Sequence, residues 1–288
     1  MNTRSNSGQN NRFEVPSSIK NTGRLLQFFS TNAAAKFAFK LFTTPPKFGT
    51  PERELMLRKS AKNIPIQVPG IEEEIMLYEY GFSKRKVLLT HGWAGRGTQL
   101  YEIADKLLEH GFMVISYDAP AHGQSGGKRT YLLDNVKAVD HIAKTYGPFE
   151  AAIGHSFGGI TLLNANAKAP LFNKIVTIGI EGSMHIILDD FVKKIGLKPK
   201  ITTAIEKHIL NDYHMAVEHI SGNESAKKIS NPVLVVHDIN DKDVDVSSAF
   251  RLRQNLKNGT LLITQGLGHR KILRDQSVID RILSFIKS

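Results

Sequence analysis

Short apolar runs alternate with amphipathic segments along most of this chain. From residue 64 onward, an apolar run is usually followed by a turn and then by a segment with apolar residues every three or four positions. Runs of the first kind are typical of buried strands, and segments of the second kind are typical of helices. The alternation predicts an α/β protein in which helices flank a mostly parallel central sheet. The expected strands lie near residues 64–68, 74–80, 87–89, 112–117, 151–153, 174–180, 232–236 and 259–264.

One interval between the strands lacks this rhythm. Residues 181–230 contain no convincing strand, but they contain two helical patterns, one around Phe191 and one around Ile205. Because parallel strands end at one edge of a sheet, where ligands bind, an insertion at that edge can cover a site. We therefore expect one α/β domain over residues 64–288 that carries a helical cap at about 181–230.

The first 63 residues form an extension with a different pattern. Residues 1–23 are polar and predict a loose tail. Residues 24–42 contain five phenylalanines, with apolar residues at helical spacing, and they predict an amphipathic helix that ends before a Pro-Pro pair. Three uses of this helix are open. It can pack on the body of the protein, cover a site, or contact an anionic membrane surface with the help of Lys36 and Lys40.

Composition narrows the classes of function. The chain has 288 residues, of which 41% are hydrophobic, and this is enough for one large core. It has no cysteine, which excludes disulfides, thiolate metal sites and a cysteine nucleophile. The net charge of +11 is spread along the sequence, so no nucleic-acid site is predicted. Since no apolar stretch reaches the ~18 residues of a membrane span and no secretory signal is recognisable, we expect a soluble, cytoplasmic protein.

The strongest chemical signal is the sequence Gly154-His155-Ser156-Phe157-Gly158. It follows an apolar run and precedes a helical pattern, which is the strand–turn–helix context of a nucleophile elbow. In such a turn the serine hydroxyl projects from a strained backbone, and the two glycines leave room for the strand and the helix to approach each other. Ser156 is the predicted nucleophile. The backbone N–H of Phe157, at the start of the helix, is one predicted oxyanion donor.

Two further turns follow earlier strands. The turn His91-Gly92-Trp93 can direct the backbone N–H of Trp93 towards the same oxygen, which would complete an oxyanion hole. His91 itself is expected to bond its own turn. Asp118 and His122 lie in the other turn, where we expect a self-bonded loop near the site entrance.

Together these motifs resemble the α/β-hydrolase superfamily, in its serine-hydrolase branch of esterases, lipases and serine aminopeptidases. The resemblance rests on the His-Gly turn at 91–92, the loop at 118–125 and the elbow at 154–158, and it covers residues 64–288. The run 91–97 also resembles a group of uncharacterised bacterial hydrolases. The resemblance implies the α/β-hydrolase fold, with nucleophile, acid and base in that order along the chain.

The resemblance also points to an acid and a base in the C-terminal part. Asp238, Asp241 and Asp243 follow the strand at 232–236, and the superfamily pattern aligns with Asp241, while the other two stay open as alternatives. The implied base is His269, in a glycine-rich loop after the last strand. A serine at the elbow argues against haloalkane dehalogenases and epoxide hydrolases, in which the superfamily has an aspartate at that position.

These residues predict hydrolysis of a carboxylic ester by a Ser156–His269–Asp241 triad through an acyl-enzyme. The same triad would also suit a thioesterase, a peptidase, a lactonase or a peroxide-using enzyme. A non-catalytic binding protein of the same fold is the remaining alternative. No cofactor and no metal are expected, because the sequence contains no zinc-protease, P-loop or dinucleotide motif. The expected partner is a small-molecule ester or acyl substrate.

Overall fold

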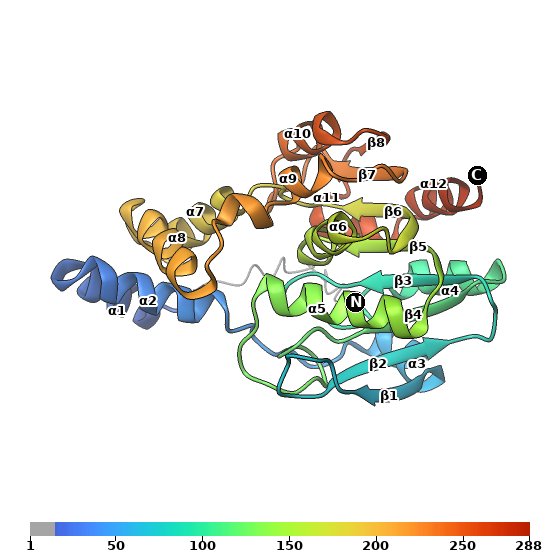
Figure 1. Ribbon diagram of the computed structural model, residues 1–288, viewed down its shortest axis with the longest axis horizontal. Coiled ribbons are helices and arrows are strands. Elements are labelled where there is room, and N and C mark those ends of the chain that lie inside the picture. The colour runs from blue at the N-terminus through green and yellow to red at the C-terminus, as the bar shows by residue number, and fades with distance from the viewer. Residues whose placement is uncertain (1–14) are drawn as a thin grey trace, which may run out of the picture.

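A computed structural model describes residues 15–288. Its centre is an eight-stranded sheet with the strand order β1-β2-β4-β3-β5-β6-β7-β8 (Figure 1). β2 pairs antiparallel with both β1 and β4, and all other neighbours pair in parallel, which confirms the predicted mostly parallel sheet. The strands are β1 (Lys62–Ile66), β2 (Ile75–Tyr80), β3 (Lys86–Thr90), β4 (Met113–Tyr117), β5 (Phe149–His155), β6 (Phe172–Ile178), β7 (Val233–Asp238) and β8 (Gly259–Thr264).

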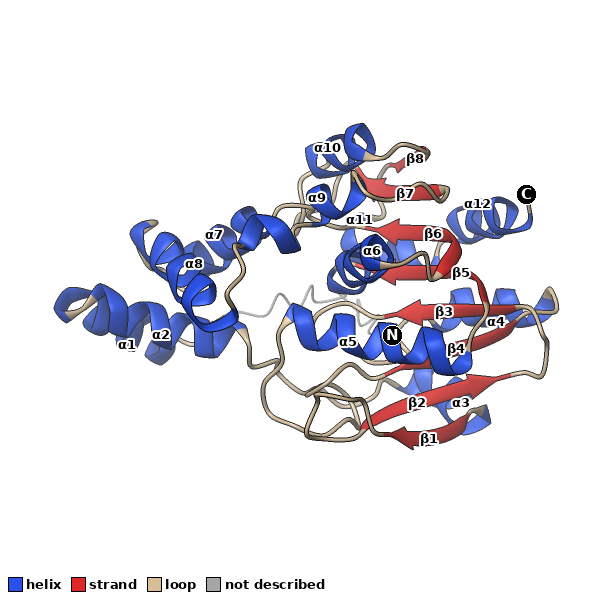
Figure 2. Cartoon of the chain, viewed as in Figure 1, coloured by secondary structure: helices blue, strands red, loops and turns tan. Residues whose placement is uncertain are grey.

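Helices cover both faces of the sheet (Figure 2). Successive side chains of a strand point to opposite faces, so each inner strand contributes to two cores. In β3, Leu88 joins one core, while Val87 and Leu89 join the other. The first core is covered by α5 (Leu132–Tyr146), α6 (Phe157–Lys168), α9 (Gly222–Ala226) and α10 (Ser247–Asn255). The second is covered by α3 (Glu52–Ser60), α4 (Tyr101–Glu109), η2 (Ile272–Arg274) and α12 (Gln276–Lys287).

Four helices form a projection beyond the edge where the parallel strands end (Figures 1 and 2). α1 (Ser17–Phe29) and α2 (Thr31–Phe42) come from the N-terminal extension, and α7 (Met184–Lys194) and α8 (Lys200–Tyr213) come from the insertion, where two helices were predicted. α2 packs against both α1 and α8, and three of its alanines are fully buried, which allows neighbouring helices to approach closely. Within residues 15–288, no helix has the length and hydrophobicity that crossing a bilayer requires. The short segments η1 (Val217–Ile220) and α11 (Gly268–Lys271) complete the fold.

The N-terminal extension differs from the expectation in three respects. The single helix predicted over 24–42 is two helices, because Ser30 is extended (φ −154°) and its hydroxyl accepts a hydrogen bond from the Ala33 N–H (3.2 Å) at the start of α2. Residues 17–23, predicted as part of a loose tail, begin α1, whereas residues 1–14 of that tail lie outside the described residues. α3 was not predicted, because its sequence has no apolar periodicity.

Candidate active site

Ser156 lies in a strained turn between β5 and α6, as the elbow motif predicts. Its backbone is left-handed (φ 49°), and its N–H donates to Ile178 O (2.9 Å) at the end of β6. The flanking glycines are required by close packing. A Cβ on Gly154 would lie 2.6 Å from Gly159 Cα, and a Cβ on Gly158 would lie 2.4 Å from Thr90 O. The turn therefore presses α6 against the ends of two neighbouring strands and presents the serine at the sheet edge.

The two predicted oxyanion donors belong to residues close to Ser156. Phe157 is the first residue of α6, where backbone N–H groups have no partner within the helix. Trp93 follows Gly92, at which a Cβ would lie only 3.4 Å from Ser156 Cβ. The rings of Trp93 and Phe157 contact each other edge to face, with centroids 5.2 Å apart. Within residues 15–288 neither N–H makes a hydrogen bond to the protein, so both are available to a substrate oxygen.

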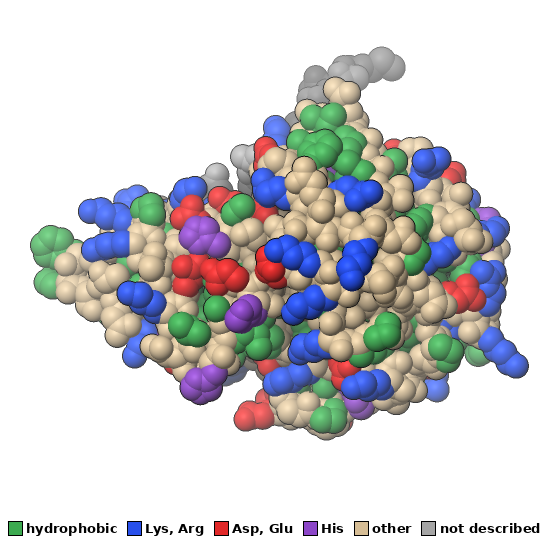
Figure 3. Space-filling view, turned by 45° about the horizontal axis from the view of Figure 1, so that its top comes forward, with side chains coloured by type: hydrophobic (Ala, Val, Ile, Leu, Met, Phe, Trp, Pro, Cys, Tyr) green, Lys and Arg blue, Asp and Glu red, His purple; other side chains and the backbone are tan. Residues whose placement is uncertain are grey.

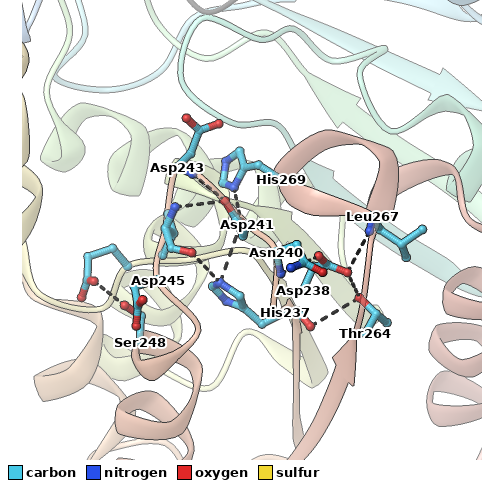
Figure 4. A network of polar contacts seen from close by, with 12 residues as sticks. His237, Asp238, Asn240, Asp241, Asp243, Asp245, Ser248, Thr264, Leu267 and His269 are labelled. Carbon is cyan, nitrogen blue, oxygen red and sulfur yellow. Dashed lines mark hydrogen bonds and ion pairs between the residues drawn. The ribbon is translucent and has the colours of Figure 1, made fainter. Parts of the chain in front are cut away.

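The predicted acid and base form a direct pair (Figure 4). His269 Nδ1 lies 2.7 Å from Asp241 Oδ2, and Oδ1 of the same carboxylate accepts hydrogen bonds from the N–H groups of Asp243 (2.8 Å) and Val244 (3.0 Å). Burial alone raises the pKa of Asp241, but the hydrogen bonds from His269 and these two amides outweigh it and hold the pKa below its ordinary value. Asp241 is therefore an ionised carboxylate, and it orients the imidazole.

The other two aspartates have different surroundings. Asp238 is buried, and its carboxylate accepts hydrogen bonds from the Thr264 hydroxyl (2.7 Å), the Leu267 N–H (3.0 Å) and the Asn240 N–H (2.9 Å). It thus ties the end of β7 to the loop that carries His269. Asp243 is exposed, and it contacts Asp241 through its backbone.

A cation site can also be considered at this position. Possible ligand atoms of Asp241, Asp243 and His269 lie within 4.8 Å of one another. However, the Asp241 carboxylate already accepts two backbone N–H groups as well as the imidazole. This donor set suits a fixed imidazole better than a metal ion, which would have to compete with all three donors.

The structure brings Ser156 and the His269–Asp241 pair to the same sheet edge. Gly179, directly after β6, lies close to His269, because a Cβ on Gly179 would lie 3.1 Å from His269 Nδ1. The residue before it, Ile178, accepts the backbone hydrogen bond from Ser156. Among the described residues, the structure contains no hydrogen bond between the Ser156 hydroxyl and His269. Catalytic hydrogen bonds of this type are often long before substrate binds, so the arrangement is compatible with the predicted triad.

His155 is a neighbour of the site that sequence reasoning left without a role. Its Nε2 donates to the backbone oxygen of His269 (3.0 Å), and the two rings lie 4.6 Å apart. Burial, and then the nearby His269, keep the pKa of His155 well below its ordinary value, so this ring is neutral. The elbow motif places His155 next to the nucleophile, but contact with a loop more than 100 positions away is visible only in the fold.

His91 and His122 bond their own loops. His91 Nδ1 donates to Gly92 O (2.7 Å), and its Nε2 accepts from the Ala119 N–H (2.9 Å). His122 Nδ1 donates to Pro120 O (3.0 Å). Burial lowers the pKa of His91 to about 4 and that of His122 to about 3. Both imidazoles are therefore neutral, and they join the turn after β3 to the turn after β4.

Aromatic side chains line the site on the side of the projection. Phe42, at the end of α2, stacks on Trp93 with ring centroids 6.2 Å apart. Phe191 of α7 contacts Phe42 at 5.2 Å, and Trp93 contacts Phe157. We call Phe42, Trp93, Phe157 and Phe191 the aromatic wall. It connects the N-terminal extension and the insertion with the two available amides.

The chain matches two family models. Residues 86–199 match the model described as alpha/beta hydrolase fold, and residues 214–288 match the model of TAP-like proteins. Among curated proteins, the uncharacterised hydrolase YugF of Bacillus subtilis is 23% identical over 248 residues, which cover 71% of this chain and 90% of that protein. A monoacylglycerol lipase of Mycolicibacterium smegmatis is 29% identical over 92 residues, which cover 29% of this chain and 33% of the lipase.

Solved structures share the architecture. An esterase of Pyrococcus furiosus superposes with a TM-score of 0.67 at 17% identity, covering 85% of this chain and 98% of the esterase. At this identity the likeness concerns the fold. The parallel sheet, the strained serine turn after β5 and the matches to both family models lead to one conclusion: the chain belongs to the α/β-hydrolase superfamily.

Proposed function

We propose that this protein is a serine hydrolase that cleaves a carboxylic ester through Ser156, His269 and Asp241. Membership of the superfamily supports hydrolysis in general. The more specific proposal is carried by one arrangement: the strained Ser156 turn lies at the same sheet edge as the 2.7 Å His269–Asp241 hydrogen bond. A nucleophile, a base and a group that orients the base are the parts that acyl transfer requires.

In the proposed reaction, Ser156 Oγ attacks the ester carbonyl carbon while His269 Nε2 accepts the hydroxyl proton. Asp241 holds the Nδ1–H, so that Nε2 is the free nitrogen, and it stabilises the imidazolium. The amides of Trp93 and Phe157 donate to the carbonyl oxygen as it becomes negative, and each such donor contributes ~3 kcal/mol. His269 then protonates the leaving alcohol. Water that is deprotonated by His269 releases the acid from the acyl-enzyme.

The aromatic wall supports an apolar acyl or aryl group on the substrate. Two of its rings belong to the residues that carry the two amides, and Phe42 and Phe191 continue the ring contacts outward from Trp93. Apolar surroundings with a few placed polar groups are typical of small-molecule sites. A thioester, a peptide or a lactone would use the same nucleophile. Turnover of matched esters, thioesters and amides over a series of acyl chain lengths separates these substrates.

The first test is the substitution Ser156→Ala. We expect the purified protein to hydrolyse short-chain nitrophenyl esters and to react covalently with a fluorophosphonate probe. We expect Ser156→Ala to lower ester turnover by roughly 10⁴-fold or more and to abolish labelling, because the variant lacks the hydroxyl that would form the acyl-enzyme. Initial rates and gel fluorescence of the labelled protein measure both effects.

A matched control is Ser60→Ala, which removes an exposed hydroxyl at the end of α3. This variant should retain turnover and labelling. Undiminished turnover in Ser156→Ala would remove Ser156 from the mechanism. A folded wild-type protein that is inert towards both esters and the probe would instead favour the non-catalytic alternative.

A further inference from the structure

The free end of α1 exposes large apolar side chains. The side chains of Leu25, Phe28 and Phe29 are 60%, 83% and 76% exposed, and the two phenylalanine rings contact each other edge to face at 5.2 Å. Figure 3 shows hydrophobic side chains at this far end of the projection, with Lys and Arg side chains beside them. We call these three residues the apolar tip. Isolated exposed apolar residues are common, but three on one helix end form a patch.

The apolar tip is held in place by the opposite side of α1. Gln27 Oε1 accepts a hydrogen bond from the Lys198 N–H (2.7 Å), and Arg24 Nε donates to Gly196 O (3.5 Å). Gly23 is buried against Leu197, which would lie 3.1 Å from a Cβ at that position. Since the loop after α7 fixes this side of α1, the other side presents its apolar residues in a fixed arrangement.

Positive charge accompanies the apolar tip. α1 and α2 contain four basic residues and no acidic residue. The loop that packs on α1, together with the helix ends that flank it, adds the exposed side chains of Lys194, Lys198 and Lys200. The nearby carboxylate of Asp189 on α7 pairs with Lys193 (2.8 Å) and accepts a hydrogen bond from the Thr202 hydroxyl. A second carboxylate, Asp190, also lies near Lys193. The basic residues at this end outnumber these two carboxylates, so the surface around the tip has a net positive charge.

We propose that the apolar tip docks on an anionic phospholipid surface. Phenylalanine and leucine on one side of a helix insert at the boundary between headgroups and acyl chains, and nearby Lys and Arg side chains strengthen binding to an anionic surface. A second copy of the chain is the less favourable occupant, because it would bring the same positive charge to the contact.

Docking at this end would place the active site close to the lipid surface. α2 has 12 residues and, at 1.5 Å per residue, spans about 18 Å from the tip to Phe42 on the aromatic wall. The docking itself does not depend on Ser156. Failure of docking and failure of the proposed esterase activity are therefore separate results.

The test is flotation of the full chain with lipid vesicles. One set contains phosphatidylcholine and phosphatidylglycerol, and the other contains phosphatidylcholine alone. We expect the wild-type protein to float with the anionic vesicles, to float weakly with the neutral ones, and to dissociate as salt is raised. The double variant Phe28→Ser/Phe29→Ser should bind anionic vesicles at least tenfold more weakly, and so should Lys198→Glu/Lys200→Glu.

The matched control is Met56→Ser/Phe82→Ser, which removes two apolar side chains that are at least as exposed and lie outside the projection, in α3 and after β2. This control should float like the wild type, and turnover of a soluble ester or circular dichroism confirms that each variant is folded. The proposal is overturned if the wild-type protein stays in solution, or if Phe28→Ser/Phe29→Ser floats equally well. Concentration-dependent dimerisation that this variant abolishes, without vesicle binding, would assign the tip to a second copy.

Discussion

His155 illustrates how a residue outside the predicted triad can determine its geometry. Its ring packs on the ring of His269, and its Nε2–H donates to the His269 backbone oxygen. Nδ1 of His155 is buried and, within the described part of the chain, has no partner. The side chain therefore fixes the loop of the base through one hydrogen bond and one ring contact, and it is a positioning residue for the proposed reaction.

The substitution His155→Phe keeps the ring contact but removes the hydrogen bond. We expect kcat for a soluble ester to fall about tenfold with little change in KM, since a misplaced base affects proton transfer more than binding. His155→Gln places an amide N–H at a similar reach and should restore much of the loss. Steady-state kinetics of both variants measure this. Equal losses in the two variants, or a loss confined to KM, would contradict the positioning role.

The sequence narrows the candidates for the acid of the proposed triad to three aspartates, but the choice among them depends on tertiary contacts. The Asp238 carboxylate accepts hydrogen bonds from Thr264, on the neighbouring strand β8, and from the Leu267 N–H. Asp243 is exposed. Of these three, Asp241 alone has a carboxylate that makes a hydrogen bond to His269 within residues 15–288, which favours it as the acid of the proposed triad. These contacts depend on how the loop after β7 meets the loop after β8, which the spacing of residues along the sequence does not encode. The elbow was readable because Gly154 must leave room for Gly159, only five positions later in the chain, which is a local steric requirement.

At the level of elements, buried strands were easier to predict than the helices of the extension. The inner strands are covered on both faces, so they are nearly continuous apolar runs. Even β8, at the edge of the sheet, begins and ends where the pattern predicted. The break at Ser30 was missed because apolar spacing continues across it, and only the extended backbone of one residue separates α1 from α2. α3 was missed because it buries little more than Leu57 and Glu54.

The contact between α6 and β3 gives a prediction on stability. Gly158→Ala would place a methyl group 2.4 Å from Thr90 O, so strand and helix must separate. We expect the free energy of unfolding to fall by roughly 1–3 kcal/mol, as for overpacked cores. Urea denaturation measures this change. Gly49→Ala is the control, because a Cβ there meets no atom within 4 Å, and a similar loss in both variants would refute the steric argument.

For the whole molecule, the buried neutral histidines predict how stability depends on pH. The folded pKa of His91 is about 4, whereas an unfolded histidine titrates near pH ~6.5. Between these values the unfolded chain binds the additional proton, so stability falls as pH falls. His91 alone should lower the free energy of unfolding by about 2 kcal/mol from about pH 7.5 to about pH 5.

Urea denaturation at these two pH values tests the expectation. The glutamine in His91→Gln cannot take up a proton. The difference between its free energies of unfolding at the two pH values should therefore be smaller than that of the wild type by the same ~2 kcal/mol. This holds even if the variant is less stable at both pH values. His122 and His155, which are also buried and have lowered pKa values, account for part of the remaining slope. An unchanged slope in His91→Gln would show that His91 does not contribute.

The stacking of Phe42 on Trp93 has a practical consequence. Trp93 is the only tryptophan of the chain, and it lies where the N-terminal extension, the insertion and the proposed oxyanion hole meet. The tryptophan fluorescence of the protein therefore originates from a single indole beside the proposed reacting groups. An unlabelled sample thus carries its own optical reporter, and emission spectra can register ligand entry or displacement of α2 in real time.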